Sequence, residues 1–337
     1  AVRAKAKLEA RKTCADDICG TSAIKVETKP RAVQYLLYSS ASRIECTGGV
    51  GGCLIPPGIG IPRTLTYWEV VQHALGSSLV APINDDIDFG MQFFPGKNAS
   101  AFTCDVATAP EVKPDKGTEI TILSAMLEKL PFGFSPVVQV LENVAENPGR
   151  LADPGVEVAV VMLTDGGDNC AGGEQAEVVA RLGTAAKKLL DQGVETYVVR
   201  YGSAAGRTPE QDAQLRAIVA NGGTASTDPT DLSKVPYIYA KSDQELSAAL
   251  ARISDQLATC SFALGGLPED ADKARANLYL NGQVIRFDSD DEGNDGWTWQ
   301  DAEQTAVQLH GEACEAFKTN RKTSVVVEFG CAPIVLL

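Results

Sequence analysis

Hydroxyl and carboxylate side chains follow apolar segments of the sequence at positions where they could bind a metal ion. Ser40 and Ser42 come after an apolar run that ends at Tyr38. Thr118 begins a helical pattern, and Asp165 directly follows a second apolar run. Hydroxyl and carboxylate oxygens are the ligands that Mg²⁺, Mn²⁺ and Ca²⁺ prefer. These residue types therefore predict a site for a hard divalent cation.

The segments around these residues alternate between strand and helix patterns. The run at 156–163 is apolar and β-branched, as in a strand buried on both faces of a parallel sheet. Other strand patterns lie at 33–38, 87–94, 194–201 and 237–240, and helical patterns at 66–79, 118–130, 135–145, 174–192, 209–220 and 243–257. This alternation predicts an α/β fold with a doubly wound, mostly parallel sheet flanked by helices. In such sheets ligands bind beyond the carboxyl ends of the strands.

Three motifs give this part of the chain a resemblance to the von Willebrand factor A domain, the fold of integrin I domains. They are "YSSAS" with Ser40 and Ser42, "KGTEI" with Thr118, and "MLTDGGDN" with Asp165. The resemblance implies a metal-ion-dependent adhesion site, in which a ligand carboxylate often completes the metal shell. The family has an aspartate at the first position of this site, where the present sequence has Tyr38.

Tyr38 removes one of the carboxylates that the resemblance would bring to the metal. A tyrosine hydroxyl, with a pKa near 10, carries no charge at neutral pH, and its ring adds bulk. The sequence therefore predicts a degenerate site that holds no metal, or a weakly bound Mg²⁺, Mn²⁺ or Ca²⁺. Without metal, Ser40, Ser42 and Thr118 would satisfy backbone groups at a strand end and a helix start.

Nine cysteines predict a disulfide framework in an oxidising compartment. No C-x-x-C pair occurs and only two histidines are present, so the usual zinc patterns are absent. The odd number leaves one residue unpaired among Cys14, Cys19, Cys46, Cys53, Cys104, Cys170, Cys260, Cys314 and Cys331. The close pairs at 14/19 and 46/53 are typical of local loop staples.

Two longer-range bridges are also predicted. Cys104 and Cys170 both lie just beyond strand ends on the presumed ligand side, so we expect them to be bonded. At least one bridge is expected among Cys260, Cys314 and Cys331, because a hairpin in that region would be marginal by itself.

The character of the sequence divides the chain into three parts. Residues 1–29 are polar and weakly periodic and predict an N-terminal arm, and residues 30–258 would form the A-like domain. Beyond them, Asn281 and Gly282 are typical of a type I′ hairpin turn, so residues 259–337 predict a small, disulfide-linked β-rich domain. Its motifs "GWTWQ", "LHGEAC" and "VEFGC" resemble cysteine-rich secreted or lipid-anchored surface proteins of myxobacteria and related bacteria.

Composition and missing motifs restrict the function. The net charge of −14 argues against a nucleic-acid partner, which would require a basic surface. No apolar run reaches the roughly 18 residues of a membrane span. The basic N-terminus lacks the apolar core of a signal peptide, which a mature chain would have lost. No P-loop, nucleophile elbow or dinucleotide fingerprint occurs, so we do not expect an enzyme.

The expected function is recognition at the outer cell surface or outside the cell. In this interpretation, an extracytoplasmic bacterial surface protein binds a protein or glycan ligand through the strand-end face of its A-type domain. The alternative is a structural subunit of a surface assembly or filament, in which the same fold is a metal-free scaffold. Self-association would then use residues 1–29, the unpaired cysteine or the C-terminal strand.

Overall fold

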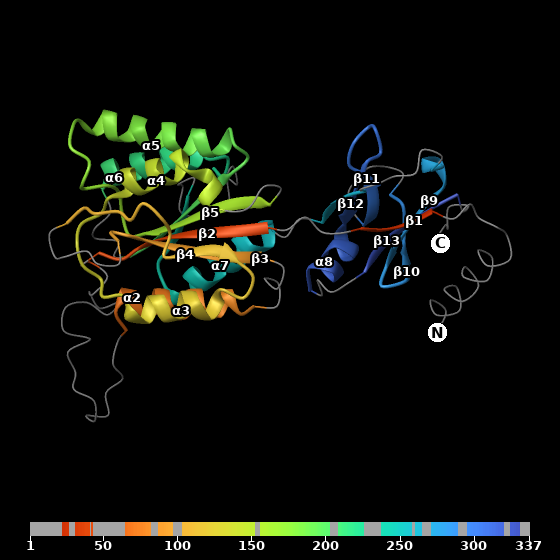
Figure 1. Ribbon diagram of the computed structural model, residues 1–337, viewed down its shortest axis with the longest axis horizontal. Coiled ribbons are helices and arrows are strands. Elements are labelled where there is room, and N and C mark those ends of the chain that lie inside the picture. The colour runs from red at the N-terminus through yellow and green to blue at the C-terminus, as the bar shows by residue number, and fades with distance from the viewer. Residues whose placement is uncertain are drawn as a thin grey trace, which may run out of the picture. The chain divides into compact units, whose positions relative to one another are not determined.

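A computed structural model of the protein describes residues 22–26, 31–40, 42, 65–81, 87–96, 103–151, 156–202, 208–225, 237–257, 260–264, 271–288, 295–319 and 324–330. The chain forms two compact units (Figure 1). The larger unit comprises residues 30–257, and the smaller unit comprises residues 258–337 together with 1–29.

The larger unit contains a six-stranded sheet with the strand order β4-β3-β2-β5-β6-β7. Neighbouring strands are parallel except for the edge strand β4, which runs antiparallel to β3. The strands are β2 (Arg31–Tyr38), β3 (Ile87–Phe94), β4 (Val112–Asp115), β5 (Glu157–Thr164), β6 (Glu195–Tyr201) and β7 (Ile238–Ala240). The chain therefore moves outward from the centre of the sheet in both directions, as in doubly wound folds.

Helices cover both faces of this sheet, and an apolar core lies on each side. One layer contains α2 (Tyr67–Leu79), α3 (Glu119–Glu128) and α7 (Asp243–Leu257), and the other contains α4 (Val137–Glu146), α5 (Gln175–Leu190) and α6 (Pro209–Asn221) (Figure 1). The predicted doubly wound α/β fold is confirmed.

Local sequence features explain several of these elements. Along β5, Val161 and Leu163 face one core while Val160 and Met162 face the other, which accounts for the continuous apolar run. Helix α2 begins with a capping box, in which the Thr66 side chain accepts a hydrogen bond from Glu69 N and Thr66 N donates to the Glu69 carboxylate.

The smaller unit contains two short sheets, ordered β1-β13-β9-β10 and β11-β12-β8. Its elements are β1 (Ser22–Val26), β8 (Ser261–Ala263), β9 (Ala276–Leu280), β10 (Gln283–Ile285), β11 (Gly296–Trp299), β12 (Ala306–His310), α8 (Gly311–Thr319) and β13 (Val325–Phe329). The predicted hairpin joins β9 to β10 through Asn281 and Gly282, both with positive φ as a type I′ turn requires.

The predicted bridge in this region is Cys260–Cys314, with Cα atoms 5.5 Å apart. It connects the start of β8 to α8, a helix that the sequence analysis did not predict. The predictions for Cys14, Cys19, Cys46, Cys53 and Cys331 concern residues outside the described ranges.

Strand β1 differs from the expectation that residues 1–29 form a separate arm. Residues 22–26 pair antiparallel with β13, with Val26 opposite Val325 and Ser22 opposite Phe329. Five residues are too few for a clear periodic pattern, and the partner strand lies roughly 300 residues later in the chain. Local sequence patterns therefore gave no signal for this pairing. In the described part of the chain, no helix combines the length and apolar character needed to cross a membrane.

Candidate functional site at the carboxyl edge of the sheet

The carboxyl end of β2 brings Tyr38, Ser40 and Ser42 together with Asp165, which directly follows β5. Ser40 Oγ donates a hydrogen bond to the Tyr38 hydroxyl. Ser42 Oγ lies 3.0 Å from Ser40 Oγ and 3.3 Å from the Tyr38 hydroxyl oxygen, and it donates to Asp165 Oδ2 at 2.5 Å. Three of the four residues proposed from the sequence as metal ligands therefore lie in one hydrogen-bonded cluster.

The Tyr38 hydroxyl lies among the oxygen atoms that a metal ion would need. Its side chain is only 4% exposed, and its ring packs against Phe94 with the centroids 5.6 Å apart. Both serines bond to this phenol, and Ser42 also donates to Asp165, the only carboxylate in the cluster. A neutral phenol at the centre and a single formal negative charge do not fit a hard dication, which prefers several charged oxygen ligands. Within the described ranges, no group of three or more His, Cys, Asp or Glu side chains is placed to hold a metal.

Thr118, the fourth proposed ligand, lies elsewhere, so its assignment to this cluster is wrong. Its Oγ1 is 2.5 Å from the backbone oxygen of Phe89 and 2.9 Å from that of Asp115. Phe89 is paired with Val33, five residues before Tyr38 on β2. At about 3.3 Å per residue, this places Thr118 roughly 16 Å from the cluster along the sheet.

The physical reason is the short strand β4, which the sequence analysis did not predict. It runs back along β3 from Met91 to Phe89 and returns the chain to the amino-terminal half of the sheet before α3 begins. The helix that follows therefore starts far from the ends of β2 and β5.

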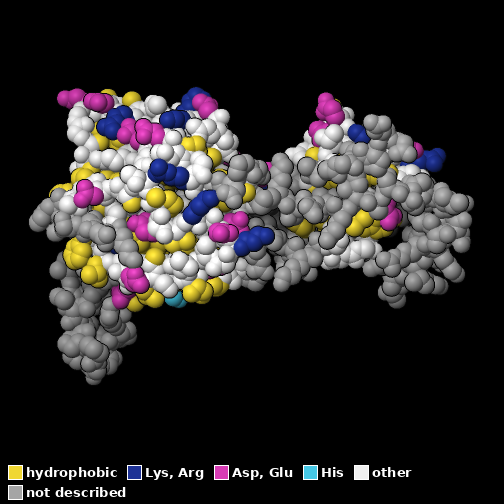
Figure 2. Space-filling model, in the orientation of Figure 1, with side chains coloured by type: hydrophobic (Ala, Val, Ile, Leu, Met, Phe, Trp, Pro, Cys, Tyr) yellow, Lys and Arg dark blue, Asp and Glu magenta, His cyan; other side chains and the backbone are white. Residues whose placement is uncertain are grey.

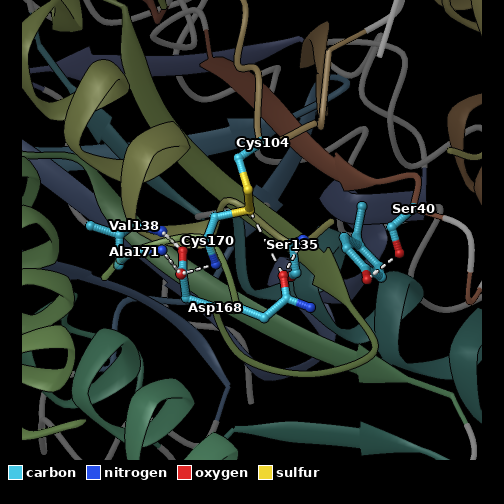
Figure 3. The surroundings of a disulfide bond; sticks show 9 residues. Ser40, Cys104, Ser135, Val138, Asp168, Cys170 and Ala171 are labelled. Carbon is cyan, nitrogen blue, oxygen red and sulfur yellow. Dashed lines mark hydrogen bonds between the residues drawn. A yellow bond between two sulfur atoms is a disulfide. The ribbon is translucent and has the colours of Figure 1, made fainter. Parts of the chain in front are cut away.

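A different hydroxyl, that of Ser135, lies at the carboxyl edge. Figure 3 shows it between the Cys104–Cys170 bridge and Ser40. The Ser135 side chain is 2% exposed, and its Oγ bonds to no group in the described ranges. Its backbone is held by Asn169, whose Oδ1 accepts from Ser135 N at 2.6 Å and whose N donates to Ser135 O at 3.1 Å. The sequence analysis saw Ser135 only as the start of a helix, although a hydroxyl before a helix in the segment "GFSP" was an available signal.

Asp168 ties the loop after β5 to the start of α4 (Figure 3). Its carboxylate accepts hydrogen bonds from Val138 N at 2.7 Å, Cys170 N at 2.8 Å and Ala171 N at 2.5 Å. Its own backbone N donates to Gln214 Oε1. A carboxylate at a helix N-terminus is favoured by the helix dipole, and here it also organises a turn.

The predicted bridge between Cys104 and Cys170 is confirmed. The S–S distance is 2.05 Å, the Cα atoms are 5.7 Å apart, and the bonded residues are separated by 66 positions. The bridge connects the segment after β3 to the loop that Asp168 organises, so it clamps two of the segments that form the carboxyl edge.

A buried lysine completes the edge at the end of β3. Lys129 Nζ donates to the backbone oxygen of Gly96 at 2.7 Å and lies 5.7 Å from the centroid of the Phe93 ring. Burial lowers the pKa of Lys129 to about 8, and the nearby Glu111 opposes part of this effect.

The strand order and the helices on both faces give the larger unit the doubly wound, mostly parallel α/β fold that the sequence predicted. No family model matches the sequence. No curated protein matches it either.

Several solved structures are similar to the chain. One is proximal thread matrix protein 1 from the mussel byssus, with 16% identity, a TM-score of 0.42, and coverage of 71% of this chain and 50% of that protein. Another is the pilus adhesin SpaC from Lactobacillus rhamnosus GG, with 11% identity, a TM-score of 0.48, and coverage of 91% and 39%.

The vWF domain of the type V pili tip protein Mfa5 from Porphyromonas gingivalis is also similar, with 8% identity, a TM-score of 0.43, and coverage of 68% and 96%. The chain spans half or less of the mussel and Lactobacillus proteins. These likenesses concern the fold alone.

Proposed function

We propose that the protein is an extracytoplasmic surface protein that recognises a protein or glycan through the carboxyl edge of its larger unit without using a metal ion. In this proposal it is a binding protein and not an enzyme. The observation that carries the metal-free part is the position of the Tyr38 hydroxyl, which bonds to Ser40 and lies beside Ser42. The two disulfides support an oxidising compartment outside the cytoplasm.

Covalent and hydrogen-bonded links at the edge also favour recognition. The bridge joins Cys104 to the loop after β5, and three hydrogen bonds to Asp168 hold that loop without a ligand. Binding to a pre-ordered surface loses less conformational freedom than binding to loops that order on contact. On the face shown in Figure 2, basic and acidic side chains of the larger unit are interspersed. The described side chains of that face therefore create no electrostatic field of a single sign that could select a ligand.

A first experiment tests whether the edge uses metal. Thermal unfolding of the wild type should be the same in EDTA and in 1 mM Mg²⁺ or Mn²⁺ to within about 1 °C, because a Kd of about 1 mM or weaker gives at most about 0.4 kcal/mol. Tyr38→Asp should restore a carboxylate and raise the melting temperature by several degrees when metal is added. Adding Thr118→Ala to that variant should leave the response unchanged, since Thr118 lies far from the edge. A wild type that melts much higher with metal would contradict the proposal.

A second experiment tests recognition through the edge. The wild type would be applied to arrays of immobilised glycans and extracellular proteins, with EDTA present throughout. Ser42→Arg adds bulk and charge at the edge and should abolish any binding found. Thr184→Arg makes the same kind of change on exposed α5 and should retain it. Equal loss in both variants, or binding that requires a divalent cation, would count against the edge as the contact surface.

The pairing of β1 favours a second candidate function, a subunit of a surface assembly. Residues 22–26 form the edge strand of a sheet whose other strands all follow residue 258. A strand paired at a sheet edge is a segment that two copies of a chain could exchange. Exchange of β1 between copies would join them without any new type of contact.

Covalent trapping distinguishes this candidate from a monomer. Chains with Ile24→Cys would be mixed with chains carrying Val327→Cys, because Ile24 lies opposite Val327 in the register. Exchange predicts a disulfide-linked dimer on non-reducing gels. The out-of-register mixture of Lys25→Cys with Val327→Cys should give much less. Monomers alone in both mixtures would contradict strand exchange.

A further inference from the structure

We propose that Arg200 is the cation of a binding site for a carboxylate at the carboxyl end of β6. The site lies outside the Tyr38 cluster and does not depend on the surface recognition proposed above. Three observations support the proposal. The guanidinium is buried, it has no hydrogen-bond partner among the described residues, and it lies at the carboxyl end of the sheet.

Arg200 is completely buried, with 0% of its surface exposed. Its Nε and both terminal nitrogens are each inaccessible to solvent, and none bonds to any group in the described part of the chain. The guanidinium lies over the Tyr239 ring, with its central carbon 4.9 Å from the ring centroid. Stacking on an aromatic ring offsets part of the loss of water, but it leaves the N–H donors unused. A buried charge in this condition is strongly unfavourable unless an oxygen partner binds to it.

The sheet register places Arg200 near the candidate functional site. Arg200 is directly paired with Thr164 on β5 and with Tyr239 on β7. Leu37 is paired with Leu163, so Tyr38 is one position further along β2, at the level of Thr164. Tyr38 and Arg200 therefore lie on either side of β5, about 10 Å apart between backbones. Ligands of doubly wound sheets bind at this end of the strands.

Polar groups near this end of the sheet are already used within the protein. Thr164 Oγ1 donates to Gly166 O at 2.7 Å. The Asp168 carboxylate accepts three backbone N–H groups, and Asp212 accepts the hydroxyl of Tyr237. None of these groups hydrogen-bonds to the guanidinium, so an oxygen partner for it would come from outside this set.

The chemistry of the guanidinium indicates the class of ligand. Its planar fork of N–H donors matches the two oxygens of a carboxylate. One negative charge neutralises one guanidinium. A sulfate or phosphate dianion would leave an uncompensated negative charge in a protein that already carries −14. The geometry and the charge therefore favour a monoanionic carboxylate.

The test measures thermal unfolding at pH 7 and constant ionic strength, with sodium acetate or formate replacing sodium chloride. Because the side chain is fully covered, a carboxylate must enter through a local opening of the edge, so samples are incubated before heating. At about ten times the Kd, the wild-type melting temperature should rise by about 3–5 °C relative to chloride. Sulfate at the same ionic strength should give a smaller rise.

Two variants assign the response to Arg200. Arg200→Met keeps a long side chain without the charge, and it should show no difference between acetate and chloride. Lys241→Met is the matched control, because Lys241 also lies near the Tyr239 ring, at 5.8 Å, but is exposed. It should keep the full wild-type response. If Arg200→Met does not fold, Arg200→Lys retains the charge without the fork and should lose most of the response.

A blocked peptide, acetyl-Gly-Asp-Gly-amide, distinguishes a free carboxylate from one carried on a polypeptide. Stabilisation by acetate alone supports a site for small free acids, and stabilisation by both supports a site that also accepts an acidic side chain. The proposal is overturned if neither compound stabilises the wild type more than chloride does. It is equally overturned if Arg200→Met responds as the wild type does.

Discussion

The ends of β2 and β6 belong to the same edge of the sheet, but their polar side chains are in different states. At β2, Tyr38, Ser40 and Ser42 bond to one another and to Asp165. At β6, the buried Arg200 has no hydrogen-bond partner in the described ranges. Only one strand, β5, separates them.

This contrast shows that polar side chains at the same edge can serve either the stability of the fold or the binding of a ligand. A buried polar cluster whose members satisfy one another stabilises one arrangement of the edge and has little affinity left for an added ion. A buried group that the protein leaves unsatisfied has a strong need for a ligand. We therefore expect the part of the edge that most resembles a metal site to be the part least available for a metal ion.

The largest expected effect concerns the bridge that holds this edge. Replacing Cys104 and Cys170 together by alanine should lower the free energy of unfolding of the larger unit by about 4 kcal/mol, the chain-entropy value for a loop of this length. Urea unfolding followed by intrinsic fluorescence measures it. Replacing Cys260 and Cys314 is the control, because it should act on the smaller unit only. A loss below about 1 kcal/mol would show that the hydrogen bonds at the edge suffice without the bridge.

Lys129 is a buried cation that, unlike Arg200, donates a hydrogen bond to an acceptor, so it provides a second test of the comparison. Its lowered pKa means that the unfolded chain binds this proton more tightly than the folded chain does. Stability should therefore rise with pH from about 8 towards the ordinary lysine value of 10.5. Between pH 7.5 and 9.5 the gain should be about 1–2 kcal/mol. Urea unfolding at several pH values measures the slope, and Lys129→Met should remove it. An unchanged slope in that variant would assign the effect to other groups.

Tyr38→Phe tests the contribution of the phenol oxygen to the cluster at β2. The ring should still pack on Phe94, but Ser40 would lose its acceptor, so stability should fall by about 1–2 kcal/mol. Comparison of chemical unfolding midpoints gives the value. A neutral result would mean that the hydroxyl is not a structural member of the cluster.

The smallest effects distinguish a bonded hydroxyl from an unbonded one. Ser40→Ala removes a hydroxyl that bonds to Tyr38 and should cost about 1 kcal/mol. Ser135→Ala removes a buried hydroxyl that has no partner in the described ranges, and it should be neutral or slightly stabilising. Thermal unfolding of the two variants side by side makes the comparison. Equal losses would show that Ser135 also belongs to the bonded network.

The sequence was sufficient for features that depend on local patterns. Residue types and the local patterns around them were enough to predict three features. They are the apolar run of β5, the I′ turn at Asn281 and the Cys104–Cys170 bridge. The clustering of Ser40 and Ser42 with Asp165 follows from the carboxyl ends of parallel strands lying together. Thr118 was misplaced because the four residues of β4 reverse the chain without a visible pattern.

Other features depend on partners distant in sequence. Arg200 lies in a segment that looks like an ordinary strand, and nothing in it shows that the guanidinium is covered and stacked on Tyr239. Ser135 appeared to be a helix start because its relation to the loop after β5 is tertiary. The role of residues 22–26 depends on β13, at the opposite end of the chain.

The pairing of β1 with β13 also has a consequence for the timing of synthesis. Strand β1 leaves the ribosome long before its partner, because roughly 300 residues separate Val26 from Val325. At about 5–20 residues per second, β1 waits for roughly 15–60 s. During that interval the whole of the larger unit, encoded between the two strands, is synthesised. The pairing of β1 with β13 can therefore form only after the larger unit has been made.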